Sequence, residues 1–250
     1  MKAISKTQLI EAVRTWDAKQ VADTLRERPE FVSLLDDAGR TLLHHCARRP
    51  ISNENSRAAS IATANVLLKT GVPIDAVAPI KDDGEVFPAT ALWYALAWGR
   101  NRPLASFLLK AGADPNHCMF ALVYADDLAS AKLVRRYGAE VDEIFGGETP
   151  LIYAMRHQRA RFAEWLLKEG VNPNARDRRG LSAMHHAVRR RLPESTLKAL
   201  LKAGADTGAV ATDGTTVAQL ATRAQRAALR IDVAPTKHAA ARSRQRAVQP

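Results

Sequence analysis

The stretch Gly147-Glu148-Thr149-Pro150-Leu151-Ile152-Tyr153-Ala154 returns at residues 180–187 as Gly180-Leu181-Ser182-Ala183-Met184-His185-His186-Ala187. The two glycines are 33 residues apart. Each copy is followed by an apolar segment that ends at a glycine turn, Trp165-Leu166-Leu167-Lys168-Glu169-Gly170 and Ala199-Leu200-Leu201-Lys202-Ala203-Gly204. A period of this length indicates units that stack on their neighbours, because one unit alone cannot bury its apolar faces.

These units resemble the ankyrin repeat. The family pattern is a finger-like turn D-x-x-G-x-T-P-L-H, a first helix ending in Ala-Ala-x-x-Gly, and a second helix ending in Leu-Leu-x-x-Gly-Ala-Asp. The resemblance covers residues 15–230. It implies an all-α ankyrin-repeat solenoid of six units, counting both caps, within a domain spanning residues 1–230. It also implies a binding surface, although repeats of this family bind unrelated partners, so the fold does not identify one.

The sequence before the first clear repeat predicts a capping unit. We expect helices at 7–15, with Thr7 as N-cap, and at 21–27. The first clear repeat begins at Asp36-Asp37-Ala38-Gly39, and its second helix is expected at 62–70 after a polar loop at 49–56.

The middle repeats depart from the regular length. Residues 79–87 predict an extended hairpin that turns at Asp83-Gly84. The third repeat is short: its finger is missing between Asn116 and His117, and its second helix is expected at 128–137. A sixth unit begins at Asp213 and closes the stack. In the best-matched repeats we expect a core that contains Leu166, Leu167, Leu200 and Leu201.

The net charge of +11 favours an acidic protein, a nucleic acid or an anionic membrane surface as partner. The excess is uneven, because residues 222–250 hold seven basic residues against Asp232 alone. Residues 231–250 show no apolar periodicity, and we expect them to form a disordered basic tail.

Location and assembly are expectations from composition. The N-terminus lacks the apolar core of a signal peptide, and no apolar run is long enough to span a membrane, so we expect a cytoplasmic monomer. Cys46 and Cys118 fall in different repeats and are expected as free thiols. The Ala- and Arg-rich composition suggests a bacterial protein, for which secretion into a host as an effector is the alternative location.

The sequence contains no recognisable catalytic or metal-binding motif. His44-His45 and His185-His186 are adjacent pairs, and neighbouring helical residues point in different directions, so neither pair can chelate one ion unaided. The resemblance gives His44 and His185 a structural role, a hydrogen bond to the backbone of a neighbouring finger. Acidic pairs such as Asp36-Asp37 lie in turns, where aspartates cap helices. We therefore expect neither an enzyme nor a cofactor.

The candidate partner-binding residues follow from the repeat register. In the family, the ends of the first helices and the tips of the fingers face the concave groove. Carried onto this sequence, the helix-end positions are Arg48, Arg49, Trp98, Tyr124, Arg156, His157, Arg189, Arg190 and Arg223. The finger positions are Arg40, Phe87, Glu148, Arg178 and Arg179. Arg, Trp and Tyr dominate binding hot spots, so this set predicts a groove for an acidic protein partner.

Several alternatives remain open on sequence grounds. The arginines could be solvated charges near helix C-termini, where the macrodipole favours cations. Trp98 could pack under the long hairpin instead of facing a partner. The tail together with the groove could serve a nucleic-acid-associated protein, and an enzyme with an unrecognised site is the third functional class. The resemblance leaves an adaptor, an inhibitor and a host-directed effector equally open.

Overall fold

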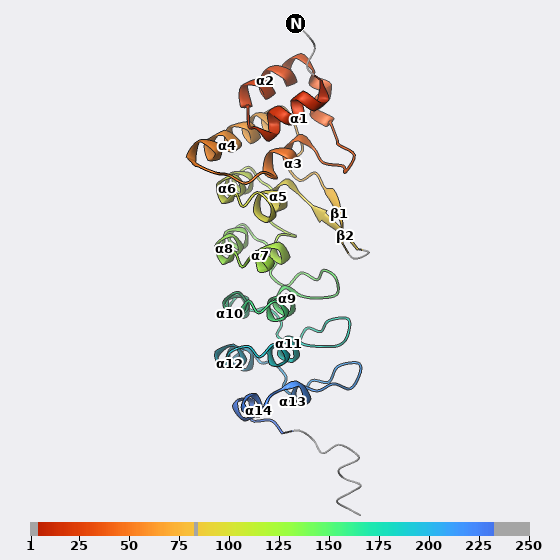
Figure 1. Ribbon diagram of the computed structural model, residues 1–250, viewed down its shortest axis with the longest axis vertical. Helices are drawn as coiled ribbons and strands as arrows, with labels where there is room; N and C mark the ends of the chain where they lie inside the picture. The colour runs from red at the N-terminus through yellow and green to blue at the C-terminus, as the bar shows by residue number, and fades with distance from the viewer. Residues whose placement is uncertain (1–4, 83–84, 233–250) are drawn as a thin grey trace, which may run out of the picture. The chain divides into compact units, whose positions relative to one another are not determined.

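The computed structural model describes residues 5–82 and 85–232, and the chain is mostly helical (Figure 1). It divides into two compact units after Glu143, and each unit is described by itself. That residues 1–230 form one domain stays a prediction. The expected disorder of the basic tail concerns residues that, from 233 onward, lie outside the described part of the chain.

The first unit is built from helical pairs and one hairpin. Its described elements are α1 (Lys6–Arg14), α2 (Ala18–Glu27), the 3-10 helix η1 (Pro29–Ser33), α3 (Leu42–Ala47), α4 (Glu54–Lys69), β1 (Ala78–Asp82), β2 (Glu85–Ala89), α5 (Ala91–Ala97), α6 (Arg102–Lys110), α7 (Met119–Ala125) and α8 (Leu128–Arg136).

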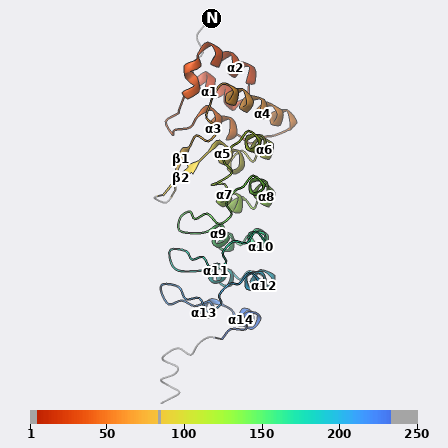
Figure 2. The same ribbon diagram turned by 180° about the vertical axis from the view of Figure 1, so that it is seen from behind.

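These helices form two layers (Figures 1 and 2). The first helix of each pair packs on the next first helix, α1 on α3, α3 on α5 and α5 on α7. The second helices pack in the same way, α2 on α4, α4 on α6 and α6 on α8. The core between the layers contains fully buried leucines, among them Leu9, Leu42, Leu67, Leu104 and Leu122.

Three helix starts in this unit differ from the prediction because of capping. Helix α2 begins at Ala18 rather than at residue 21, since Asp17 caps it by accepting the Gln20 N–H. Helix α1 begins one residue earlier, with Ser5 rather than Thr7 as N-cap, since Ser5 and Gln8 form a reciprocal capping box. Helix α4 begins at Glu54, inside the predicted polar loop. There Asn53 Oδ1 accepts the Ser56 N–H at 2.8 Å, and Ser56 Oγ accepts the Asn53 N–H at 3.0 Å. The predicted polar loop at 49–56 was therefore too long, because its last residues belong to α4.

The two irregular repeats are confirmed. Strands β1 and β2 pair antiparallel from Ala78–Ala89 to Asp82–Glu85, so the long finger is a hairpin as predicted. In the third repeat only residues 111–118 separate α6 from α7, without a finger, and His117 takes a φ of 62° at the bend. Cys46 and Cys118 are both free and buried, and burial raises the pKa of the Cys46 thiol to about 12.

The second unit contains three regular pairs. They are α9 (Pro150–Arg156) with α10 (Ala160–Lys168), α11 (Ala183–Arg189) with α12 (Glu194–Lys202), and α13 (Val217–Leu220) with α14 (Arg223–Leu229). Helices α9, α11 and α13 form one layer and α10, α12 and α14 the other. The finger turns project beside the first layer, away from the second (Figures 1 and 2). Each finger is closed by a short bridge, as between Arg176 and Ser182.

The core prediction for the second helices is half wrong. Leu166 and Leu200 are fully buried, but Leu167 and Leu201 are partly exposed. A helical turn of 3.6 residues allows only one of two adjacent leucines to point at the centre of the interface. The buried side of α10 is instead completed by Phe162, which is 0% exposed, and by Trp165.

The family glycine after the first helix is absent from the two best-matched repeats. Gln158 and Arg191 occupy its position with φ values of 59° and 55°. A left-handed backbone conformation costs a residue with a Cβ roughly 1–2 kcal/mol of conformational free energy. At both positions the backbone takes a conformation that favours glycine, although a residue with a Cβ stands there.

We expect Gln158→Gly to stabilise the second unit by about 0.5–1 kcal/mol. Relief of the left-handed strain exceeds the extra entropy that glycine gives the unfolded chain. Gln158→Ala is the matched control, because it removes the same side chain but keeps the Cβ, and it should leave stability unchanged. Chemical denaturation measures both. An equal gain in the two variants would mean that the glutamine side chain, rather than the backbone, carries the strain.

Candidate functional site

The first-helix ends of the second unit lie where the register predicts. Helix α9 ends at Arg156 with His157 as its C-cap, and α11 ends at Arg189 with Arg190 as its C-cap. Arg223 does not follow this pattern. It is the first residue of the second helix α14, because Thr222 caps that helix immediately after the short α13.

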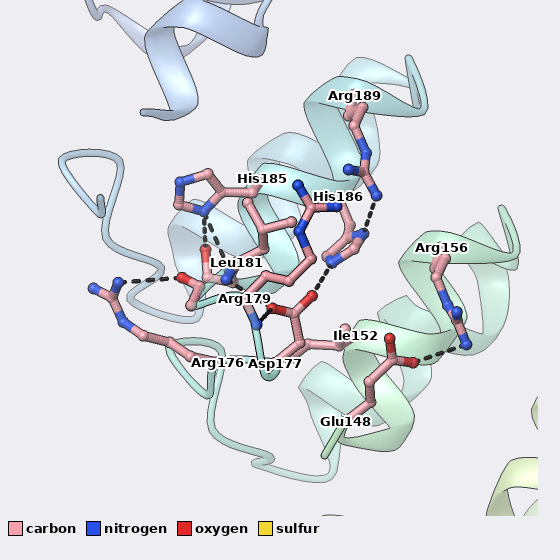
Figure 3. A network of polar contacts seen from close by, with 12 residues as sticks. Glu148, Ile152, Arg156, Arg176, Asp177, Arg179, Leu181, His185, His186 and Arg189 are labelled. Carbon is pink, nitrogen blue, oxygen red and sulfur yellow. Dashed lines mark hydrogen bonds and ion pairs between the residues drawn. The ribbon is translucent and has the colours of Figure 1, made fainter. Parts of the chain in front are cut away.

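A buried polar network links a finger of this unit to α11 (Figure 3). Asp177 accepts the backbone N–H groups of Arg179 and Leu181, both at 2.9 Å, and lies 2.8 Å from His186 Nε2. The Arg189 guanidinium donates to His186 Nδ1 at 3.3 Å. Since arginine can only donate, Nδ1 is the acceptor and Nε2 carries the proton that reaches Asp177.

The electrostatics of this network keep His186 neutral. Burial lowers the pKa of His186, although the carboxylate of Asp177 opposes that effect. Burial acts to raise the pKa of Asp177, but the hydrogen bonds from His186 and from two backbone N–H groups outweigh it and lower the pKa. Because both ring nitrogens are occupied and the His186 side chain is 2% exposed, the network positions the finger and offers no reactive group.

The first unit places an aspartate, a histidine and an arginine in the same order, but there the histidine Nε2 makes no hydrogen bond to the carboxylate. His45 Nε2 lies 3.1 Å from Asp36 Oδ2, and Arg14 Nε donates to His45 Nδ1 at 3.4 Å. Asp36 also accepts the Arg40 Nε–H at 2.7 Å. Burial, and next the charge of Arg14, lowers the pKa of His45 to about 4. The sequence carries a signal for both sites, because the spacing D-x-x-G-x4-H-H occurs at 36–45 and again at 177–186.

The other histidine of each pair has the structural role that the resemblance implies. His44 Nδ1 accepts the Thr41 N–H at 3.1 Å, and its Nε2 lies 3.3 Å from the carbonyl oxygen of Ala89 in the next finger. His185 Nδ1 accepts the Ser182 N–H at 3.1 Å, and its Nε2 lies 3.3 Å from the carbonyl oxygen of Thr215. Both rings tie the start of a first helix to the following repeat.

Several predicted contact residues of the second unit contact each other. Arg156 Nη2 lies 2.9 Å from Glu148 Oε2, and its guanidinium carbon lies 5.1 Å from the centre of the Tyr153 ring. His157 stacks on the same tyrosine, with ring centres 4.3 Å apart. The stem of Arg178 passes so close to Gly147 that a side chain there would collide with it.

Arg179 and Arg190 are two of the exposed arginines of this unit. Arg190 is exposed and forms no ion pair with a carboxylate in the described part of the chain. The Arg179 side chain is 65% exposed, and its nearest carboxylate, Asp213, is 3.7 Å away. An external acidic group would meet less internal pairing at these two positions than at Arg156, which is paired with Glu148 at 2.9 Å.

The predicted residues of the first unit divide into buried and exposed groups. Phe87 is 7% exposed and packs against Trp93 and His117, so it anchors the hairpin and leaves the set of contact candidates. Arg40 is paired with Asp36. Tyr124 is 62% exposed and Trp98 is 39% exposed. Trp98 packs edge-on against Trp93, which in turn contacts Phe87, so the alternative of packing toward the hairpin is partly correct.

Arg48 and Arg49 stack on tryptophan rings. The guanidinium carbon of Arg48 lies 4.8 Å from the centre of the Trp98 ring, and that of Arg49 lies 5.5 Å from the centre of the Trp16 ring. Such cation–π contacts hold a guanidinium in place while leaving its N–H edge available.

Within the described residues, no helix is long and apolar enough to cross a membrane. The same residues contain no group of three or more His, Cys, Asp or Glu side chains arranged to hold a metal ion.

Comparison with known proteins identifies the repeats. Residues 118–211 match the family described as "Ankyrin repeats (3 copies)". The ankyrin repeat domain of human ASB11 is similar in structure, with a TM-score of 0.67, 20% identity, and coverage of 91% of this chain and 99% of that one. The ankyrin repeat domain of Bcl-3, described as a unique member of the IkappaB protein family, gives a TM-score of 0.69 and 21% identity, covering 89% of this chain and 97% of that one.

No curated protein matches the sequence. The low identities to the solved structures relate folds only. Ankyrin repeats are generally protein–protein interaction modules and are typically not enzymes. Residues 118–211 are therefore ankyrin repeats, and the chain as a whole has the ankyrin-repeat fold.

Proposed function

We propose that the chain binds an acidic partner protein through the helix-end surface of its second unit, which we define as Arg189 and Arg190 at the end of α11 and Arg179 in the adjoining finger. In the first unit, Arg48, Arg49, Trp98 and Tyr124 are separate candidates for contact with the partner. The observation that carries this proposal is the exposure of Arg190, which forms no ion pair with a carboxylate in the described residues, and of Arg179, whose ion pair with the exposed Asp213 is long, at 3.7 Å. Guanidinium groups form forked hydrogen bonds with carboxylates, and exposed aromatic rings bury a large area at low entropic cost.

The net charge supports an acidic partner. An excess of +11 attracts negatively charged surfaces and raises the rate of encounter at low salt. The role that follows from such binding is that of an adaptor, an inhibitor or an effector acting in the cytoplasm. A nucleic acid is the second candidate partner, favoured by the seven basic residues between 222 and 250.

Charge reversal at the most exposed positions tests the proposal. We expect Arg179→Glu/Arg190→Glu to weaken partner binding by at least about 30-fold, which corresponds to roughly 2 kcal/mol at desolvated contacts. The measurement is recovery of partners from a lysate by the full chain, followed by titration of each recovered partner. Arg156 is avoided, because a carboxylate at that position would face Glu148 and disturb the fold.

The matched control reverses two charges on the second helices. Arg161→Glu/Lys202→Glu changes the net charge equally, at exposed positions of α10 and α12. Both variants should unfold within about 0.5 kcal/mol of the wild type. Loss of partners in the control together with their retention in the helix-end variant would overturn the proposal. A log-linear fall of affinity with salt, and recovery of nucleic acid instead of protein, would favour the second candidate.

A further inference from the structure

A shallow basic pocket lies at one end of the first unit. Its volume is about 300 Å³, and it is lined by Arg14, His45, Arg48 and Arg49. Arg14 is the last residue of α1, and Arg48 and Arg49 follow α3 directly, so the two first helices bring their C-terminal ends together here. His45 forms the buried wall, with a side chain that is 1% exposed.

The three arginines are held in place without carboxylates. Arg48 stacks on Trp98 and Arg49 on Trp16, as described above. Arg49 Nη1 donates to the Arg14 carbonyl oxygen at 3.3 Å, and Trp16 is itself fixed by a 2.8 Å bond from its Nε1 to the carbonyl oxygen of Cys46. None of the three forms an ion pair with any carboxylate in the described part of the chain.

The nearest carboxylate does not neutralise the pocket. Asp36 lies on the far side of His45, at Nε2, whereas the pocket arginine Arg14 contacts Nδ1. Asp36 is already occupied by Arg40 and by the backbone N–H groups of Ala38 and Arg40. His45 is neutral near pH 7, because burial and the charge of Arg14 lower its pKa. Three positive charges therefore surround a concave space whose complement is an anion.

A phosphoryl group matches this space best. It carries a charge of about −1.5 to −2 and presents three strong acceptor oxygens, whereas a carboxylate carries one charge and two oxygens. Three guanidinium groups whose planes are set by aromatic rings or by neutral acceptors offer their N–H edges to such an ion without reorganising.

An adjoining pocket indicates what carries the phosphoryl group. It shares Arg49, has a volume of about 350 Å³, and is otherwise lined by the uncharged residues Thr15, Trp16, Pro50, Ser52, Asn55, Ser56 and Ala59. A nucleic acid would place its next phosphate in or beside this adjoining pocket, which supplies no further cation. A peptide instead places a neutral residue beside its phosphoserine, and hydroxyl, amide and apolar groups suit such a residue.

We propose that the basic pocket of the first unit binds the phosphoryl group of a phosphorylated peptide segment in a partner protein. The inference rests on the proposed function, since it names a chemical feature of that partner. Regulation follows from it, because phosphorylation of the partner would then switch the contact on.

Calorimetric titration of the full chain tests the pocket without any partner. The probes are inorganic phosphate, a short peptide with one phosphoserine between neutral residues, its serine and glutamate counterparts, and a single-stranded oligonucleotide, all at one ionic strength. We expect saturable binding of phosphate and tighter binding of the phosphopeptide. The serine and glutamate peptides should bind at least tenfold more weakly than the phosphopeptide.

Variants assign the binding to the pocket. Arg48→Gln/Arg49→Gln should weaken phosphopeptide binding at least tenfold. The control Arg26→Gln/Arg57→Gln removes two exposed arginines of the same unit that are paired with Asp23 and Glu54, and it should change the affinity less than twofold. If circular dichroism shows that the pocket variant is unfolded, Arg14→Gln, at an exposed helix end, replaces it in the same comparison.

Four results would overturn the inference: absence of saturable phosphopeptide binding, an equal loss in the control and pocket variants, equal affinity for the glutamate peptide, or preferred binding of the oligonucleotide. Failure of the proposed function is separate. It would show as unchanged partner recovery by Arg179→Glu/Arg190→Glu, while the phosphopeptide titration, which involves only the first unit, could still succeed.

Discussion

Leu166→Ala should lower the free energy of unfolding by about 2–5 kcal/mol, whereas Leu167→Ala should lower it by less than about 1 kcal/mol. The two residues are adjacent in α10 and chemically identical, but Leu166 is 0% exposed and Leu167 is partly exposed. Truncating Leu166 loses the transfer free energy of its methyl groups and leaves a cavity beside Phe162 and the neighbouring helices. Truncating Leu167 removes partly exposed atoms, and water can fill their place, so no cavity forms and little stability is lost.

Urea denaturation followed by circular dichroism measures this pair. The midpoint should fall for Leu166→Ala while the dependence on urea stays constant, which shows that stability and not the compactness of the denatured state has changed. Leu200→Ala and Leu201→Ala in α12 repeat the comparison one period later, with Leu200 buried and Leu201 partly exposed. Equal losses at Leu166 and Leu167 would contradict the packing of α10 described above.

The repeat fold was predictable from the sequence because its signal is redundant. The 33-residue period, the finger glycines and the apolar helices each report the same unit, so an error at one position does not move the others. The register also gave the helix-end positions of Arg156, His157, Arg189 and Arg190. It failed at Arg223, where the last unit has no connection between its helices other than Ala221 and Thr222.

Side-chain pairing was not predictable in the same way. Register assigns a position to each residue but does not say which neighbour it contacts. Arg156 and Glu148 were both expected at a partner surface, yet they lie 2.9 Å apart and pair with each other. Phe87, expected at a finger tip, is buried because the hairpin folds onto Trp93. The leucine pairs show a related limit, since a run of two apolar residues does not reveal which one faces the core.

The histidine networks were missed because each part was interpreted alone. The aspartates were interpreted as turn residues and the histidines as structural, and both interpretations are correct locally. Only the shared spacing in two repeats indicates that Asp36 belongs with His45 and Asp177 with His186. Each of the two sites therefore contains two buried histidines whose pKa values are lowered, one in the network and one beside it. Their burial makes the free energy of unfolding depend on pH.

Acidification from pH 7 to pH 4 should remove several kcal/mol of stability, with His45 alone contributing about 3 kcal/mol. Burial lowers the pKa of His44, His45, His185 and His186 in the folded chain, and that of His45 falls from 6.5 to about 4. Below pH 6.5 these histidines bind protons in the unfolded chain but remain neutral in the folded chain. The free energy of unfolding therefore decreases as the pH falls toward the folded pKa. Each unit of pKa shift corresponds to about 1.4 kcal/mol.

The two aspartates, Asp36 and Asp177, titrate at lower pH than the histidines, so the two contributions to stability can be separated. The pKa values of Asp36 and Asp177 are lowered in the folded chain, so their contribution is present above the ordinary carboxylate pKa and is lost only as the pH falls below about 4. Urea unfolding at pH 7.5, 6.5, 5.5 and 4.5 therefore samples the histidines. His45→Gln, which cannot titrate, should be less stable than the wild type at pH 7.5 and should lose less stability on acidification. Stability curves of wild type and variant that run parallel from pH 7.5 to 4.5 would show that His45 is not held neutral by its burial beside Arg14.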